Sequence, residues 1–261
     1  MLVAAAVCPH PPLLVPEVTG SAATRSAGGA ATRSVAAGAD GDRDGIGEVR
    51  AGCDAAVAGL TVARPDLIVV VGGAAAGAVY DGAAAGSLRA YGVGYTVGTG
   101  EPVLPLSLTV GAWLLRRAGL LDAGDEPPAS ARLPTRLRAV ARTAPVAECL
   151  RLGAEIARQA PRVAMLVMGD GPGRRAVGPV GADDPAADRY SAEVAAALAA
   201  ADPARLARLA PSLDDELVVS GRAAWQVLAG AADGQRLRGQ LRCAASRYEV
   251  SYLVASWDVI R

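Results

Sequence analysis

The sequence contains no phenylalanine, lysine or asparagine, and aromatic residues make up only 3% of its 261 positions. Its 26 basic residues are therefore all arginine, and they balance 26 acidic residues without a long run of either sign. Such a chain lacks the electrostatic attraction that draws proteins to nucleic acid or to an anionic membrane surface. We expect neither as a partner.

Paired cysteines and long apolar runs are absent as well. Cys8, Cys53, Cys149 and Cys243 are far apart and form no CxxC motif, which argues against a structural zinc site. A chain of this length buries enough surface to fold without disulfides. No apolar run reaches the roughly 18 residues of a membrane span, and the N-terminal run lacks the basic region of a signal peptide. The sequence predicts a cytoplasmic protein with reduced thiols.

The sequence contains a single histidine, His10. It stands in Cys8-Pro9-His10-Pro11-Pro12, directly after the apolar run 2–7. The prolines restrict the backbone around it, and an imidazole titrates near neutral pH. His10 is therefore a candidate binding group or general base. The alternative is a histidine that only hydrogen-bonds the backbone beneath a loop.

The chain does contain short apolar runs that end in glycine or proline. Residues 2–7, 67–71 and 163–168 have the composition of strands that are buried on both faces. Apolar residues recur at helical spacing over 46–63, so the first two strands and this helix predict a parallel crossover unit. Further helices are predicted at 106–118, 146–159, 190–200 and 217–232, and a short one begins at 203. An extended segment is predicted at 91–100 and a strand at 137–143.

The whole pattern predicts an α/β fold: one domain over 1–261, with a mostly parallel central sheet and helices on both faces. The alternation within 241–260 predicts an antiparallel hairpin at one sheet edge. Residues 19–45 and 121–134 are predicted loops. Open α/β sheets bind ligands beyond the carboxyl ends of their strands, so we expect a cleft there. The sequence is compatible with a homo-oligomer and leaves the oligomeric state open.

Two glycine-rich turns follow predicted strands and would lie at that edge. Gly72-Gly73 would let a ligand or another backbone approach closely, but it is not the GxGxxG motif of dinucleotide binding. The run from Gly169 to Arg175 suits an anion-binding turn, and a tight turn with solvated arginines is the alternative. The candidate catalytic residues are His10, Asp170 and Arg175, and the candidate ligand-binding residues are Gly72, Gly73, Gly169, Gly171 and Arg174.

Taken together, six segments resemble the LigB-type class III extradiol ring-cleavage dioxygenase superfamily. They are Cys8–Leu13 with Pro16-Glu17, Pro65–Gly72, Val167–Gly171, Asp184–Tyr190, Asp202–Leu209 and Ala224–Gly230. The resemblance implies one sheet with helices on both sides and a cleft at the strand ends. Enzymes of that family hold ferrous iron by two histidines and one glutamate, and a further histidine acts as acid and base.

The chain departs from that iron site at every position after His10. Gly72-Gly73-Ala74 stands where the second histidine would follow its strand, and Arg174-Arg175 stands near the acid/base histidine. The region of the glutamate offers Ser220-Gly221-Arg222, and Glu216 matches only in a shifted alignment. A two-histidine, one-carboxylate site needs two imidazoles. We therefore expect a divergent relative that has no metal or other cofactor and binds a small anionic or aromatic molecule.

Three alternatives are left open. One is a metal-independent enzyme that uses His10 as general base while Asp170 or an arginine stabilises charge. Another is an iron-dependent extradiol dioxygenase with Fe(II) as its cofactor. The third is a structural role in which side chains fill the cleft.

Overall fold

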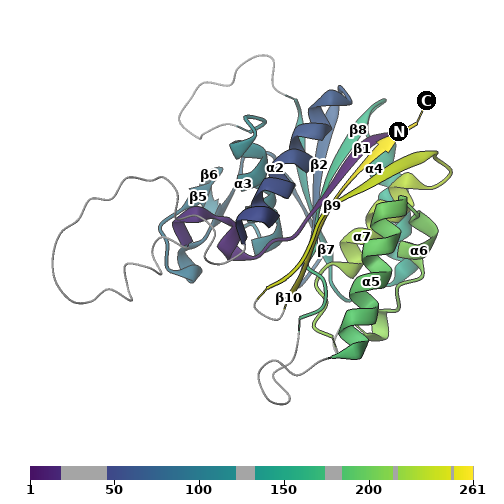
Figure 1. Ribbon diagram of the computed structural model, residues 1–261. Coiled ribbons are helices and arrows are strands. Elements are labelled where there is room, and N and C mark those ends of the chain that lie inside the picture. Colours follow the sequence, from purple (N-terminus) through teal and green to yellow (C-terminus); the bar gives the residue numbers. More distant parts are fainter. Residues whose placement is uncertain (19–45, 122–132, 174–183, 214–216, 248–249, 261) are drawn as a thin grey trace.

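The computed structural model describes residues 1–18, 46–121, 133–173, 184–213, 217–247 and 250–260 (Figure 1). The predicted loop at 19–45 and most of the one at 121–134 lie outside these residues. Among the residues described, no helix has the length and apolar character needed to cross a bilayer.

A seven-stranded sheet in the order β3-β7-β2-β8-β1-β10-β9 forms the centre of the protein. Its strands are β1 (Leu2–Cys8), β2 (Leu67–Ala74), β3 (Ala78–Asp81), β7 (Thr135–Ala141), β8 (Val163–Met168), β9 (Leu237–Arg247) and β10 (Val250–Val259). The four strands β7, β2, β8 and β1 run parallel to one another. The β9–β10 hairpin continues the sheet antiparallel to β1, and β3 closes the other edge antiparallel to β7. The predicted α/β class and edge hairpin are confirmed.

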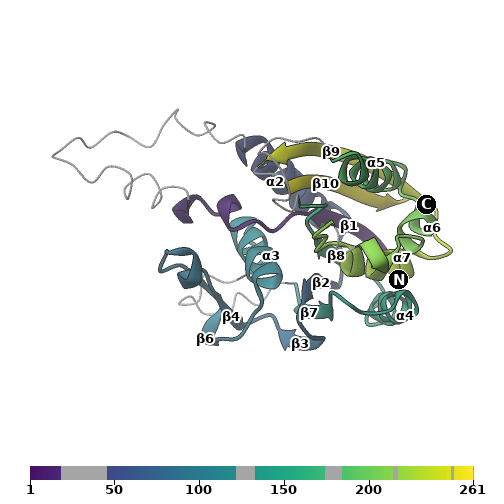
Figure 2. The same ribbon diagram turned by 90° about the horizontal axis from the view of Figure 1, so that it is seen from below.

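Helices cover both faces of this sheet, as Figure 2 shows. α2 (Ile46–Val62) and α3 (Leu106–Arg117) pack on one face, while α4 (Val146–Ala157), α5 (Pro185–Ala200), α6 (Pro203–Ala207) and α7 (Arg222–Ala232) pack on the other. Alternate residues of each central strand enter opposite cores: Val69 and Val167 face α7, whereas Val70 and Leu166 face α3. Burial on both faces explains why these strands are continuously apolar.

Glycine explains one difference from the prediction. Residues 91–100 were expected to form a single extended segment, and they instead divide between a 3-10 turn (Arg89–Tyr91) and two short strands, β5 (Thr96–Val97) and β6 (Thr99–Pro102). Gly92, Gly98 and Gly100 have positive φ, which turns the chain where an extended segment would continue. With β4 (Ala84–Ser87), which the sequence did not reveal, β5 and β6 form a small separate sheet.

Helix and strand limits also differ at several places, among them β7, which begins at Thr135 and ends at Ala141 and not at residues 137 and 143. α7 begins at Arg222 and not at Leu217, because Val218 has a φ of 51°, outside the helical region. α5 begins at Pro185, where the Asp184 carboxylate accepts hydrogen bonds from the amides of the first turn. β2 continues through the two glycines to Ala74.

Candidate functional site

His10 and Asp170 meet at the carboxyl edge of the sheet, just beyond two neighbouring parallel strands. The backbone amide of His10 donates to Oδ1 of Asp170 at 2.7 Å. The imidazole Nε2 lies 3.6 Å from Oδ2 of the same carboxylate, farther than a hydrogen bond but close enough for electrostatic attraction. One carboxylate thus holds the backbone of His10 and lies next to its ring. The sequence placed both residues at this edge, and the structure brings them together.

The His10 side chain is nearly enclosed, with 9% of its surface exposed, against 18% for Asp170. Its Nδ1 atom is buried and finds no hydrogen-bond partner among the described residues. A buried ring nitrogen without a partner is costly, because burial removes its bonds to water. This atom is the strongest indication that the site receives a polar group from outside the described chain.

Hydrogen bonds to other parts of the backbone hold the turn after β8. The amides of Gly169, Gly171 and Gly173 donate to the carbonyl oxygens of Cys8, Ser251 and Leu217, respectively, each at 2.9 Å. These three amides are therefore engaged and do not form the anion-binding turn that the glycines suggested. Arg174 and Arg175, which the sequence suggested as anion-binding residues, lie outside the described residues.

The glycines at this edge make room for other parts of the chain. A Cβ on Gly72 would lie 2.5 Å from the Ser107 hydroxyl, and one on Gly73 would lie 2.8 Å from the Ser220 carbonyl oxygen. A Cβ on Gly169 would lie 2.6 Å from the Cα of Gly221. At Gly171 the nearest atom is the Ser251 carbonyl oxygen, 2.8 Å away. At Gly73 the structure shows the close approach of another backbone, whereas at Gly72 the neighbour is the Ser107 side chain.

Arg222 is a buried charge at this edge that the sequence did not single out as a site residue. Its guanidinium donates to the carbonyl oxygens of Ala144 and Arg142 at 3.0 and 2.6 Å, and to Oε1 of Gln226 at 2.7 Å. It thereby joins the start of α7 to the turn between β7 and α4. Its sequence signal was a single charged residue opening an otherwise uncharged helix.

The residues that the structure describes do not form a ferrous iron centre. Among the described residues, no three histidine, cysteine, aspartate or glutamate side chains converge as metal ligands. Cys8, Cys53 and Cys243 share the core beneath α2, where a hydrogen bond with Cys8, together with burial, raises the pKa of the Cys53 thiol well above its ordinary value. A protonated thiol is a poor ligand for a metal ion.

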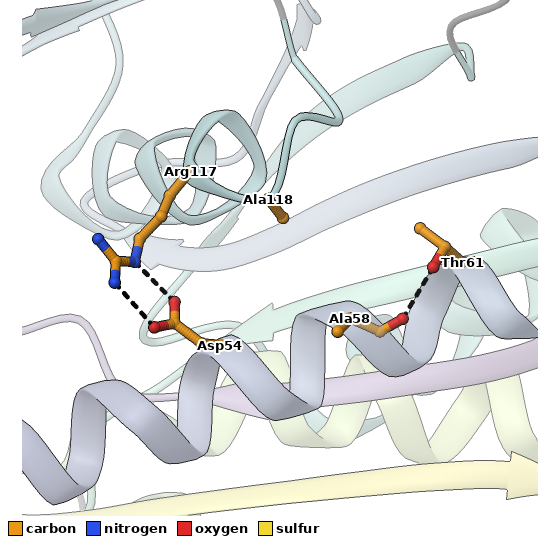
Figure 3. Close-up of a pocket in the computed structure, with 5 residues that line it drawn as sticks. All are labelled: Asp54, Ala58, Thr61, Arg117 and Ala118. Carbon is orange, nitrogen blue, oxygen red and sulfur yellow. Dashed lines mark hydrogen bonds and ion pairs between the residues drawn. The ribbon is translucent and has the colours of Figure 1, made fainter.

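Pockets formed by described residues open elsewhere on the surface. One of about 490 Å³ lies between α2 and α3 (Figure 3). Arg117 and Asp54 line it and form a two-pronged ion pair, with Nε–Oδ1 and Nη2–Oδ2 distances of 2.8 and 3.0 Å. Both side chains of this pair are more than one third exposed, so the pair is a surface feature of modest energy.

The fold and the site define an α/β protein with a histidine–aspartate pair at the carboxyl edge of its sheet. No family model matches the chain, and no curated protein matches it. Among solved structures, the chain is similar to an uncharacterised protein from Escherichia coli K12. The two share 15% sequence identity with a TM-score of 0.47, over 98% of this chain and 99% of the other. A likeness at this level assigns no function.

Proposed function

We propose that this protein is a divergent, iron-independent relative of the LigB-type extradiol dioxygenases that binds a small aromatic or anionic molecule beside His10 and Asp170. The observation that carries the proposal is the buried Nδ1 of His10, which has no partner among the described residues. A phenolic hydroxyl would satisfy it, because a neutral imidazole offers one acceptor nitrogen. Arg174 and Arg175 follow Asp170 closely in the sequence and would supply charge for an acidic ligand.

A second candidate function uses the same pair for catalysis without a metal. The Asp170 carboxylate, 3.6 Å from Nε2, would stabilise the imidazolium that forms when His10 takes a proton from a bound substrate at Nδ1. In that role Asp170 orients the ring and His10 contacts the substrate. Binding and base catalysis share this geometry, so turnover distinguishes them.

Calorimetric titration with catechol and 3,4-dihydroxybenzoate tests the proposal. We expect saturable binding to the wild type and at least tenfold weaker binding to His10→Gln, which keeps a polar side chain but removes the ring. Asp54→Asn, in the pocket between α2 and α3, is the matched control and should bind like the wild type. Product analysis after long incubation separates a binder from an enzyme.

Two results would overturn the proposal. Stoichiometric ferrous iron that is lost in His10→Gln, together with catechol-dependent oxygen uptake, would establish the dioxygenase alternative. Equal binding to wild type and His10→Gln, or no binding to either, would favour a structural role for this edge.

A further inference from the structure

A second pocket lies at the opposite edge of the sheet, where the parallel strands begin. It has a volume of about 630 Å³, within the range of small-molecule sites. It is lined by Met1, Val3, Val62, Ala63, Arg64, Arg162, Asp258 and Val259. At this edge the start of β1 lies beside the end of β10 (Figure 1).

Arg162 reaches this pocket in a fixed position. Its Nε donates to the carbonyl oxygen of Arg64 at 2.8 Å, and its Nη2 donates to that of Ala63, so the guanidinium covers the carboxyl end of α2. Its backbone amide donates to Oδ2 of Asp66 at 3.0 Å. The remaining nitrogen, Nη1, has no partner among the described residues. A guanidinium that is already immobilised loses little entropy when it binds a ligand.

Arg64 occupies a backbone position that glycine normally fills. Its φ is 48°, and its amide donates to the Thr61 carbonyl oxygen at 2.9 Å, as the left-handed residue after a helix does. This turn places Arg64 beside Arg162, whose Nε holds the Arg64 carbonyl oxygen. Arg64 is an exposed residue of the pocket lining and makes no ion pair with any described residue.

The remaining lining defines the ligand. Asp258 also faces the pocket, so the side chains that line the pocket carry two positive charges and one negative charge. The Met1 ammonium, which donates to the carbonyl oxygens of Ala160 and Pro161, adds a further positive charge, so the pocket attracts an anion. The apolar side chains beside the arginines suit a ligand with one carboxylate, because the second carboxylate of a dianion would have to lie against them. Val62 and Met1 are exposed apolar side chains, 82% and 56% accessible, and Val3 and Val259 continue this apolar surface.

We infer that this pocket is a second ligand site, which takes a small monocarboxylate with an apolar body. The carboxylate would bind Arg64 and Nη1 of Arg162, and the apolar body would cover Val62 and Met1. Binding at this edge is independent of His10, which lies at the other end of the strands.

NMR titration with hexanoate tests the inference, with hexanol and adipate as the neutral and dianionic comparisons. We expect saturable hexanoate shifts confined to the pocket residues, with weaker shifts for adipate and for hexanol. Arg64→Asn keeps a residue that tolerates positive φ and should weaken hexanoate binding about fivefold, the value of one exposed ion pair. Asp258→Asn should tighten it, because a like charge is removed. Arg158→Asn, an exposed arginine outside the pocket, should bind like the wild type.

The inference is overturned if hexanoate gives no saturable shifts, if Arg64→Asn binds as tightly as the wild type, or if adipate binds more tightly than hexanoate. His10→Gln should leave hexanoate binding unchanged. Failure of the site beside His10 would therefore not affect this result, nor would failure here affect that site.

Discussion

The backbone amide of His10 donates to the Asp170 carboxylate at 2.7 Å, across two parallel strands and 160 positions of sequence. The bond ties the proline-rich segment after β1 to the turn after β8. The same carboxylate also lies 3.6 Å from Nε2 of the His10 ring. The position of the candidate site therefore depends on one side chain.

Substitution of Asp170 should show this dependence. Asp170→Ala removes the partly buried acceptor of the His10 amide and should lower the free energy of unfolding by about 2 kcal/mol, the range for bonds to charged groups. Asp170→Asn keeps the oxygen and should cost about half as much. Urea denaturation measures both, and equal losses would show that the hydrogen bond contributes little.

The contact between α4 and α7 depends on two glycines. A Cβ on Gly230 would lie 2.0 Å from the Leu150 carbonyl oxygen, and one on Gly153 would lie 1.9 Å from that of Val227. Gly230→Ala should lower the free energy of unfolding by about 3 kcal/mol, since the helices must separate. Gly59→Ala is the matched control: Gly59 is in α2 with no atom within 4 Å, so alanine should raise stability by about 0.5–1 kcal/mol. Similar effects of both in urea denaturation would contradict this packing.

Removal of the Arg222 guanidinium should lower the free energy of unfolding. Arg222→Met removes the donor to three acceptors: the carbonyl oxygens of Arg142 and Ala144 and the side-chain oxygen Oε1 of Gln226. Each unsatisfied buried group costs about 1 kcal/mol or more, so we expect a loss of about 3 kcal/mol in thermal or urea unfolding. A double-mutant cycle with Gln226→Leu should show coupling of about 1 kcal/mol. Additive losses would argue against the shared network.

Stability should fall in alkaline solution because of the buried thiols. The hydrogen bond with Cys8 and burial hold the pKa of Cys53 well above its unfolded value near 9.0. The unfolded chain releases the proton first, so the contribution is complete below pH 9.0 and is lost as the pH rises toward the folded pKa. Guanidinium denaturation at pH 7.5 and 10 measures the loss, and Cys53→Ala should reduce it. Equal pH dependence in both proteins would exclude Cys53 as the source.

The elements that sequence reasoning found are those with a local signal. The β-branched run of β2 reflects its burial on both faces. The helical spacing of apolar residues in α2 reflects its burial on one face. A Cβ at Gly98 would collide with the Ala83 and Ala84 carbonyl oxygens, a contact between separate strands that the periodic pattern does not encode.

The candidate site could be predicted only in part. His10 and Asp170 were each placed at a strand end, but their contact requires β1 and β8 to be neighbours, which the sheet order decides. Arg222 is held by carbonyl oxygens about 80 positions earlier in the chain, and no local pattern encodes that contact.

The position of β1 in the sheet also bears on how the chain folds. Both its neighbours are distant in sequence, since β8 begins at Val163 and β10 at Val250. During synthesis, β1 leaves the ribosome well before β8 and β10, and it stays an unpaired apolar strand until they have followed. Such long-range pairing slows folding and exposes a surface that aggregates. The strand that presents His10 is thus one of the last to be secured.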